Sequence, residues 1–278
     1  MFARISRTSA TLAIAVSSVL FLTAAVQAQP VRFVSSSGLD TNNCTRTAPC
    51  RNLQRGIDRT PVRGELQILD SGNYGDNAAI AKSITISAVG VAATVGAIFI
   101  NKPSATVVLH GILLTGASLG FGSRGITVGA AAAVHIVGCQ IERFSDAGIT
   151  IHADNARVYI SNTTVRGNGL HGVHIETTSS GARLTISNSR FENNANAGIF
   201  LNGTGGSQVT IEHSVLSGNG ARGLFVGNGG IARISNSMVT DNGTGLEQSI
   251  GTLQSRGNNT VAGNNTDTSG AIDPINGI

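Results

Sequence analysis

The sequence predicts an all-β solenoid, in which the chain coils around one axis and each turn of the coil adds three short strands to three parallel sheets. A glycine followed by alternating aliphatic residues recurs at intervals of 22–26 residues from Gly125 onward. Each interval holds two further short segments in which apolar and polar residues alternate, as in strands with one buried face. No part of this repeat has the 3.6-residue period of a helix. Coiling and stacking would let such short segments bury their aliphatic side chains.

Three strands are expected in each turn of the coil. The first is the glycine-led strand, at 125–128, 148–151, 172–175, 198–201 and 223–226. The second lies at 134–138, 158–162, 184–188, 209–213 and 232–236. The third is a short strand, as at 189–191 and 237–239. A loop rich in asparagine and glycine follows each third strand, as at 166–169, 217–220 and 240–243. At the ~4.8 Å spacing of paired strands, the apolar residues of successive turns are expected to form buried columns.

Asparagines follow the second strand in three of the turns, as Asn162, Asn188 and Asn236. Asparagine tolerates the left-handed backbone conformation, and amides that are stacked above one another can hydrogen-bond along the column. We therefore expect a structural asparagine ladder at these three residues. Cys139, which lies near this position in an earlier turn, is expected to be a buried free thiol that packs as a small apolar residue.

The ends of such a coil need covering, because a terminal turn has no neighbour on its open side. Leu53 and Ile57, four residues apart within 51–59, predict a short amphipathic helix that caps the N-terminal end. We expect a single domain over 29–278. Its N-terminal segment and cap occupy 31–82, the turns of the coil occupy about 83–265, and the residues beyond form a loose C-terminal tail.

The first 28 residues are typical of an export signal. Arg4 and Arg7 precede an apolar run, and a small-residue cleavage site follows at 26–28. An uncleaved anchor is the alternative interpretation, although an apolar run of about 17 residues is short for a membrane span. Cys44 and Cys50 are expected to form a local disulfide, as in exported proteins, rather than two thiols or a zinc site. We predict an exported protein, periplasmic or extracellular, with no membrane span after cleavage.

The composition excludes several classes of function. The net charge is +4 and aromatic residues make up 4% of the chain, which is too few for the stacking platforms of single-strand-binding proteins, so no nucleic-acid partner is expected. The sequence has no phosphate loop, no G-x-S-x-G elbow and no H-E-x-x-H motif. It also has no dense aspartate run of the kind that binds calcium. We expect no cofactor and no metal.

The repeats over about 31–265 resemble the right-handed parallel β-helix superfamily, which includes the pectate-lyase-like folds. The segments 33–40, 48–54, 72–75 and 82–86 are similar to the N-terminal part of exported bacterial β-helix repeat proteins. The resemblance implies a right-handed coil in which the glycine-led strands form the first sheet. It also implies that a polysaccharide would lie on the outer face of that sheet. The catalytic motifs of pectate lyases, polygalacturonases and alginate epimerases are absent, so no catalytic residue is assigned.

Candidate binding residues lie on the outer face of the glycine-led strands. Thr127, Thr150, His174, Phe200 and Phe225 occupy equivalent positions in successive turns. Two phenylalanines in register on such a face are interpreted either as a stacking platform for sugar rings or a protein, or as a cross-strand pair that packs against itself.

Charged and imidazole side chains occur beside this column. His152 and Glu176 lie at the ends of neighbouring strands, where paired polar groups could perform acid–base chemistry or simply form ordinary surface. Asp146 and His171 precede glycines in turns and are weaker candidates. The candidate binding set is therefore His152, His174, Glu176, Phe200 and Phe225.

Three functions remain open at this point. The first, which the sequence favours, is a non-catalytic module that binds a polysaccharide or a cell-surface protein along its side. The second is a polysaccharide-active enzyme, a lyase, hydrolase or epimerase, with a site of unfamiliar composition. The third is a structural or adhesin-like scaffold. An enzyme predicts ionisable side chains that converge in one place with shifted pKa values, whereas a binding module or a scaffold does not require this.

Overall fold

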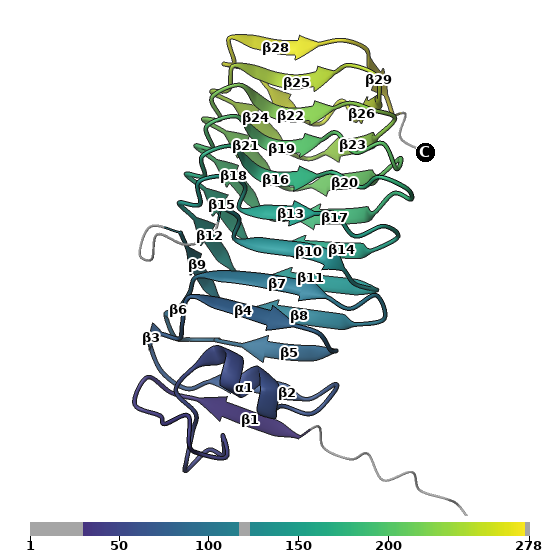
Figure 1. Cartoon of the computed structure of the whole chain (residues 1–278). Coiled ribbons are helices and arrows are strands. Elements are labelled where there is room, and N and C mark those ends of the chain that lie inside the picture. Colours follow the sequence, from purple (N-terminus) through teal and green to yellow (C-terminus); the bar gives the residue numbers. More distant parts are fainter. Residues whose placement is uncertain (1–29, 117–122, 276–278) are drawn as a thin grey trace, which may run out of the picture.

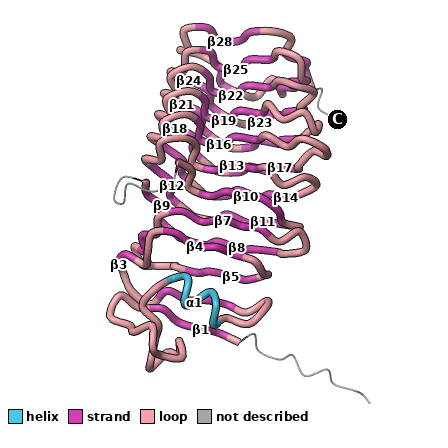
Figure 2. Tube along the Cα trace, in the orientation of Figure 1, coloured by secondary structure: helices cyan, strands magenta, loops and turns pink. Residues whose placement is uncertain are grey.

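The computed structural model of the chain describes residues 30–116 and 123–275. In this part of the chain, short strands stack along one axis as three sheets, and a single helix lies near the N-terminal end (Figures 1 and 2). The predicted signal peptide at 1–28 lies outside the described residues. Within them, no helix is long and apolar enough to cross a membrane.

The three sheets, called A, B and C here, take one strand each from successive turns of the coil. Sheet A has eleven strands: β1 (Val31–Val34), β2 (Glu65–Ile68), β5 (Ile84–Ser87), β8 (Thr106–His110), β11 (Ala133–Val137), β14 (Arg157–Ser161), β17 (Arg183–Ser187), β20 (Gln208–Glu212), β23 (Ile231–Ser235), β26 (Thr252–Ser255) and β29 (Ile272–Pro274). Sheet B has nine: β3 (Gly72–Asn73), β6 (Ala93–Val95), β9 (Leu113–Thr115), β12 (Gln140–Glu142), β15 (Thr164–Arg166), β18 (Arg190–Glu192), β21 (Val215–Ser217), β24 (Met238–Thr240) and β27 (Thr260–Val261). Sheet C has nine: β4 (Asn77–Ile80), β7 (Ala97–Asn101), β10 (Ile126–Ala130), β13 (Ile149–Ile151), β16 (His171–Ile175), β19 (Ala197–Leu201), β22 (Arg222–Val226), β25 (Thr244–Gln248) and β28 (Thr266–Ser269).

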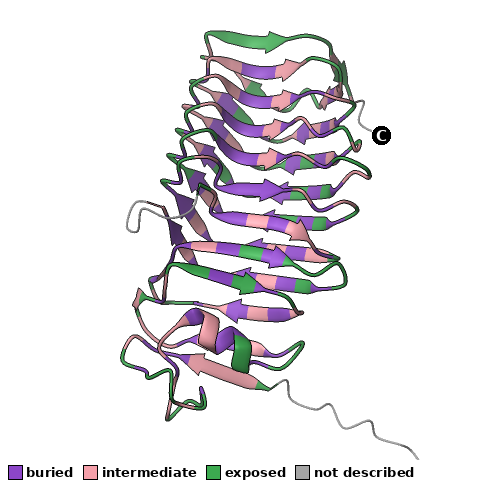
Figure 3. Cartoon of the chain, in the orientation of Figure 1, coloured by how far each residue is buried: buried purple, intermediate pink, exposed green. Residues whose placement is uncertain are grey.

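Every paired strand is parallel to its neighbour, and equivalent residues of successive turns lie beside one another. Ile136 of β11 pairs with Ile160, and the same column continues through Ile186 and Ile211 to Ile234. All five side chains are buried. Alternate residues of each strand point into this core, as the banded burial along the strands shows (Figure 3). The predicted coil with stacked aliphatic columns is therefore confirmed.

The asparagine ladder lies in a different column from the predicted one. Asn162, Asn188 and Asn236 do adopt the left-handed conformation, with φ of 50°, 49° and 48°, but all three are exposed. In the described structure, their amides form no hydrogen bonds to one another. At this corner of the coil the side chains point outward, and the amide of Asn236 donates to Glu212 and accepts from Asn258 instead. The predicted left-handed conformation of these residues is confirmed. The predicted ladder of hydrogen bonds among their three side chains was wrong.

The ladder forms instead in the turns that lead from sheet B to sheet C, where the asparagine side chains point inward. Each Nδ2 donates to the Oδ1 of the next asparagine at 2.9–3.0 Å, in the order Asn168, Asn194, Asn219, Asn242 and Asn264. Each accepting Oδ1 also takes a hydrogen bond from the backbone N–H of the preceding asparagine. These buried amides therefore satisfy one another and the turn backbone at the same time.

A second polar column lies just after the outward-facing asparagines. Ser189, Ser214 and Ser237 are buried, and the hydroxyl of each accepts a hydrogen bond from a backbone N–H of the preceding turn. Cys139 occupies this column as a buried free thiol, as predicted, and burial raises its pKa to about 11. Its thiol is therefore protonated and unreactive at neutral pH.

The N-terminal end is covered by the helix α1 (Leu53–Arg59), which contacts β1 and β4. Leu53 and Ile57 are its buried face, as predicted, and the Asn52 side chain accepts the Gln54 N–H at 2.8 Å as an N-cap. Cys44 and Cys50 form the predicted disulfide. The stack begins earlier than predicted, because β1 already pairs with β2 as the end strand of sheet A.

The C-terminal segment is also more regular than predicted. Residues beyond 265 were expected to form a loose tail, but β28 pairs with β25 and β29 pairs with β26. Ile272 packs partly against the core and so holds β29 in place. The side chains of β28 are exposed throughout, which leaves a polar end to the stack (Figure 3).

We predict that Asn194→Ala lowers the free energy of unfolding by about 1–3 kcal/mol, because it leaves the buried amides of Asn168 and Asn219 without their partner. Urea unfolding followed by circular dichroism measures the loss. The matched control is Asn188→Gly, which keeps the left-handed conformation at an exposed turn and is expected to change stability little. Equal losses in the two variants would contradict the assignment of the ladder.

Candidate functional site

The outward-facing residues of sheet C form a column along the side of the coil. Thr127, Thr150, His174, Phe200 and Phe225 lie beside one another in successive strands, which confirms their predicted register. The column is less open than an outer face would suggest. Thr150 is fully buried, and His174, Phe200 and Phe225 are half-buried.

Phe200 is the centre of an aromatic stack. Its ring lies 4.4 Å from that of His171 and 4.7 Å from that of Phe225, with interplanar angles of 18° and 14°. The guanidinium of Arg222 lies 5.0 Å from the centre of the Phe225 ring. Both faces of Phe200 are therefore occupied by neighbouring side chains. This geometry favours the interpretation that the rings pack against one another, because a sugar ring would need a free aromatic face on which to stack.

Ionisable side chains converge on the same face, beside this stack. We call Arg124, Asp146, His152, His174 and Glu176 the Arg124 cluster. Arg124 Nε donates to Asp146 Oδ2 at 2.8 Å, and its two terminal nitrogens lie 3.1 Å from His152 Nε2 and 3.5 Å from Glu176 Oε1. One guanidinium thus links two carboxylates and an imidazole that come from the next two turns of the coil.

The contacts of His152 identify the nitrogen that carries its proton. Arg124 can only donate hydrogen bonds, so Nε2 of His152 accepts and is unprotonated. The proton of the neutral ring is then on Nδ1, which lies 3.2 Å from Glu176 Oε1. The other carboxylate oxygen of Glu176 lies 3.8 Å from His174 Nε2. Glu176 is therefore placed between two imidazoles.

Unsatisfied buried polar atoms are concentrated at this site. Within the described residues, five buried side-chain nitrogens and oxygens lack a hydrogen-bond partner, and four of them belong to Thr150, His171, His174 and Glu176. Glu176 Oε1 is within ion-pair distance of Arg124 and His152, but not in hydrogen-bond geometry. Buried polar groups normally have partners, so a group of unpartnered ones needs a functional or structural explanation.

The two histidines beside Phe200 have lowered pKa values. Burial, followed by the nearby charge of His174, lowers the pKa of His171 to about 4. Burial also lowers the pKa of His174, although Glu176 and Asp146 oppose the shift. Both imidazoles are therefore neutral at pH 7 and each has a ring nitrogen with a lone pair. A neutral imidazole beside carboxylates is a group that can accept a proton in catalysis.

Three of the five residues predicted for binding, His152, His174 and Glu176, come together in the Arg124 cluster. Phe200 and Phe225 adjoin it through His171. Sequence reasoning missed Arg124 and gave little weight to Asp146 and His171. A signal was available, because Arg124 and Asp146 both lie one or two residues before the glycine that leads a sheet C strand. No group of three or more metal-binding side chains is arranged to hold an ion within residues 30–116 and 123–275.

We predict that folding stability depends on pH through His171, which is 5% exposed. Its pKa falls from 6.5 to about 4 on folding, so between these values the unfolded chain binds a proton that the folded chain does not. The free energy of unfolding therefore falls as the pH falls from 6.5 to about 4, by on the order of 3 kcal/mol.

The comparison variant is His171→Phe, which keeps a ring against Phe200 and removes the titrating group. Urea unfolding at several pH values should show that the variant loses less stability than the wild type over this range. A carbon-bound proton of the His171 ring, followed by NMR, should titrate near pH 4. Identical pH profiles for the two proteins, or titration near pH 6.5, would refute the assignment.

Comparisons with known proteins agree with this architecture. A family model described as a right handed beta helix region matches residues 67–207 and 96–266. A solved structure titled pectate lyase Pel9A has a TM-score of 0.55 and 15% sequence identity, over 90% of this chain and 69% of that chain. A rhamnogalacturonan lyase has a TM-score of 0.57 and 11% identity, over 87% of this chain and 84% of that chain. No curated protein matches the sequence.

Identities this low carry the fold and not the activity. The family match covers most of the chain, and both solved structures share the stacked parallel architecture described above. The chain therefore belongs to the right-handed β-helix family and has the pectate-lyase-like fold.

Proposed function

We propose that the chain is an exported polysaccharide-active enzyme, and that the Arg124 cluster is its acid–base site. The observation that carries this proposal is the convergence of Arg124, Asp146, His152, His174 and Glu176 beside four unpartnered buried polar atoms. The sequence favoured a non-catalytic binding module. The geometry supports the enzyme more strongly, because ionisable groups converge and the aromatic faces that would hold a sugar are covered.

Breaking a glycosidic bond needs one group that accepts a proton and one that donates a proton to the departing oxygen. Burial lowers the pKa of His174, so its ring is neutral at pH 7 and is suited to accept a proton. In a lyase reaction the sugar loses a proton and its C–O bond breaks as a C=C bond forms, so the proton that His174 accepts can return to the departing oxygen through Glu176, which lies between His174 and His152. Arg124 is a positioning residue, because it holds Asp146 and His152 in place and keeps positive charge next to both carboxylates.

The substrate class rests on two kinds of support. The structural relatives are named as lyases of pectate and of rhamnogalacturonan, both of which are polysaccharides. The Arg124 cluster also lies on the outer face of the glycine-led strands, where the resemblance places the substrate. Export is supported by the Cys44–Cys50 disulfide, because such bonds persist in oxidising compartments.

A second candidate is a module that binds a polysaccharide or a cell-surface protein without altering it. The half-buried edges of Phe200 and Phe225, with Arg222 beside them, favour this candidate, because they adjoin the Arg124 cluster on the same face even though the faces of Phe200 are covered. They extend the half-buried surface from the Arg124 cluster over two further turns of the coil.

The test is turnover of a panel of purified plant and bacterial polysaccharides, measured by release of reducing ends and by the ultraviolet absorbance of unsaturated sugars. We expect Glu176→Gln to lower kcat by about 10²–10⁴-fold on the polysaccharide that the wild type cleaves. Glu212→Gln is the matched control, because Glu212 is an exposed carboxylate beside a histidine on sheet A. It should retain wild-type activity.

The pH profile of kcat/KM gives an independent readout. Because the pKa of His174 lies below its usual value of 6.5, activity should persist as the pH falls below 6.5. Binding of a polysaccharide without turnover by the wild type would support the module instead. If the wild type neither binds nor cleaves any polysaccharide in the panel, the proposed enzyme is overturned. The structural scaffold is then the function that remains.

A further inference from the structure

A groove follows the edge at which the strands of sheet A begin, away from the outer face of sheet C. It consists of three hollows of about 270, 820 and 450 Å³. Thr106 lines the first and the second hollow, and Asn155 and Arg157 line both the second and the third. The hollows therefore join end to end across successive turns of the coil, and we call them together the Arg157 groove.

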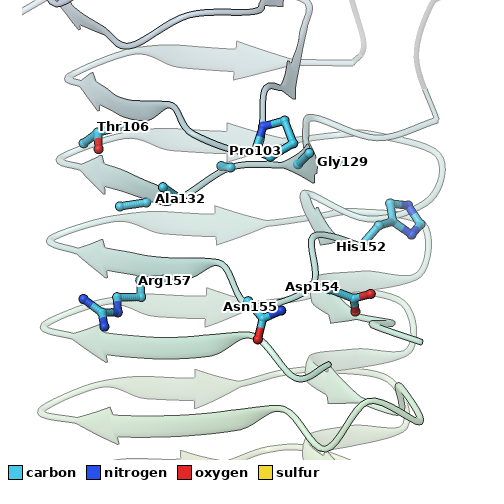
Figure 4. A pocket seen from close by; sticks show the side chains of 11 residues that line it. Pro103, Thr106, Gly129, Ala132, His152, Asp154, Asn155 and Arg157 are labelled. Carbon is cyan, nitrogen blue, oxygen red and sulfur yellow. The ribbon is translucent and has the colours of Figure 1, made fainter. Parts of the chain in front are cut away.

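The floor of the groove is made by small residues of the turns between sheets C and A. In the largest hollow, Gly129 and four alanines at 130–133 form one side, and Asn155 and Arg157 approach from the next turn (Figure 4). The third hollow has Gly181, Ala182 and Gly206 in the corresponding place. Short side chains at this corner leave room for an extended ligand along the coil.

The charged residues of the groove are mainly arginines. Arg157 and Arg183 are exposed and lie directly beside each other in neighbouring strands of sheet A, and Arg63 lines the far hollow. Neither Arg157 nor Arg183 forms an ion pair with any described residue, whereas five other arginines do. The single carboxylate that lines the groove, Asp154, accepts a hydrogen bond from the backbone N–H of Ser179.

Two like charges directly opposite each other in paired strands are destabilising. On sheet B, by contrast, Arg166 lies between two carboxylates of the neighbouring strands, Glu142 and Glu192. An anionic ligand that accepts hydrogen bonds from both guanidinium groups would remove the repulsion, since arginine binds carboxylate and sulfate-like groups in a bidentate manner.

We propose that the Arg157 groove is an attachment site for an acidic linear glycan, carboxylated or sulfated, that lies along the coil and bridges Arg157 and Arg183. A polymer fits better than a small anion, because the hollows run over several turns at ~4.8 Å each. A glycan fits better than a single-stranded nucleic acid, because no phenylalanine, tyrosine or tryptophan lines the groove and such strands are held mainly by base stacking on aromatic rings.

This site is separate from the proposed catalytic residues and needs no catalytic step. Its one link to them is His152, which lines the largest hollow and also belongs to the Arg124 cluster. A glycan held in the groove would therefore pass close to the outer face of sheet C. The attachment site would keep the protein on an acidic matrix while that face remains accessible.

The test measures binding of fluorescently labelled polymers to the full chain by polarisation at low and at high salt. Dextran sulfate and dextran share one backbone and differ in charge, and an alginate oligomer supplies carboxylates in place of sulfates. We expect binding of dextran sulfate or of alginate, no binding of dextran, and affinity that falls as salt rises. The polymer that binds identifies the acidic group.

The double variant Arg157→Ala/Arg183→Ala should lose affinity by about tenfold or more. The matched control Arg190→Ala/Arg256→Ala removes the same charge at exposed positions outside the groove and should bind as the wild type does. Glu176→Gln should also bind normally, which separates this site from the proposed catalytic one. The proposal is overturned if the two double variants lose affinity equally, if neither acidic polymer binds, or if oligo(dT) binds more tightly than both.

Discussion

The structure depends on one constraint, the in-register parallel stacking of successive turns of the coil. Each side chain lies beside its equivalent from the next turn, at the spacing of paired strands. No turn could bury its few aliphatic residues alone, so the core exists only as continuous columns such as Ile136 to Ile234. The contacts of any residue are therefore set mainly by the identities of the residues one period before it and one period after it.

Stacking of like on like stabilises some side chains and destabilises others. Aliphatic side chains, buried amides and aromatic rings gain from it, as in the ladder from Asn168 to Asn264 and the stack of Phe200 on Phe225. Like charges and unpaired polar groups are destabilised when they are stacked in this way. Two places in the described part of the chain depart from favourable stacking, the Arg157–Arg183 pair and the Arg124 cluster. Because folding alone does not explain these departures, they are where we place function.

Periodicity was sufficient to predict the stacked coil, the aliphatic columns, the cap helix and the residues that share the outer face of sheet C. It could not predict the ladder. Asn188 and Asn194 lie in two consecutive loops between strands, and only the backbone path decides which of the two side chains points inward. It also missed the full cluster, because Arg124 contacts residues up to two turns away through its long side chain. The predicted partners His152, His174 and Glu176 lie on two neighbouring turns, where strand register alone brings them together.

The buried polar atoms at and near Thr150 can be tolerated only because the neighbouring strands stabilise this part of the coil. A threonine with a fully buried and unpartnered hydroxyl destabilises a sheet, and an isolated hairpin could not tolerate it. In this coil β13 pairs with β10 on one side and with β16 on the other, and its inward-facing Ile149 and Ile151 belong to buried aliphatic columns that continue in both directions. The backbone of β13 is thus fixed from both neighbours, whatever its outward side chains do. A solenoid can in this way carry a locally unfavourable polar site in its middle turns, because the columns above and below supply the stability that the site itself does not.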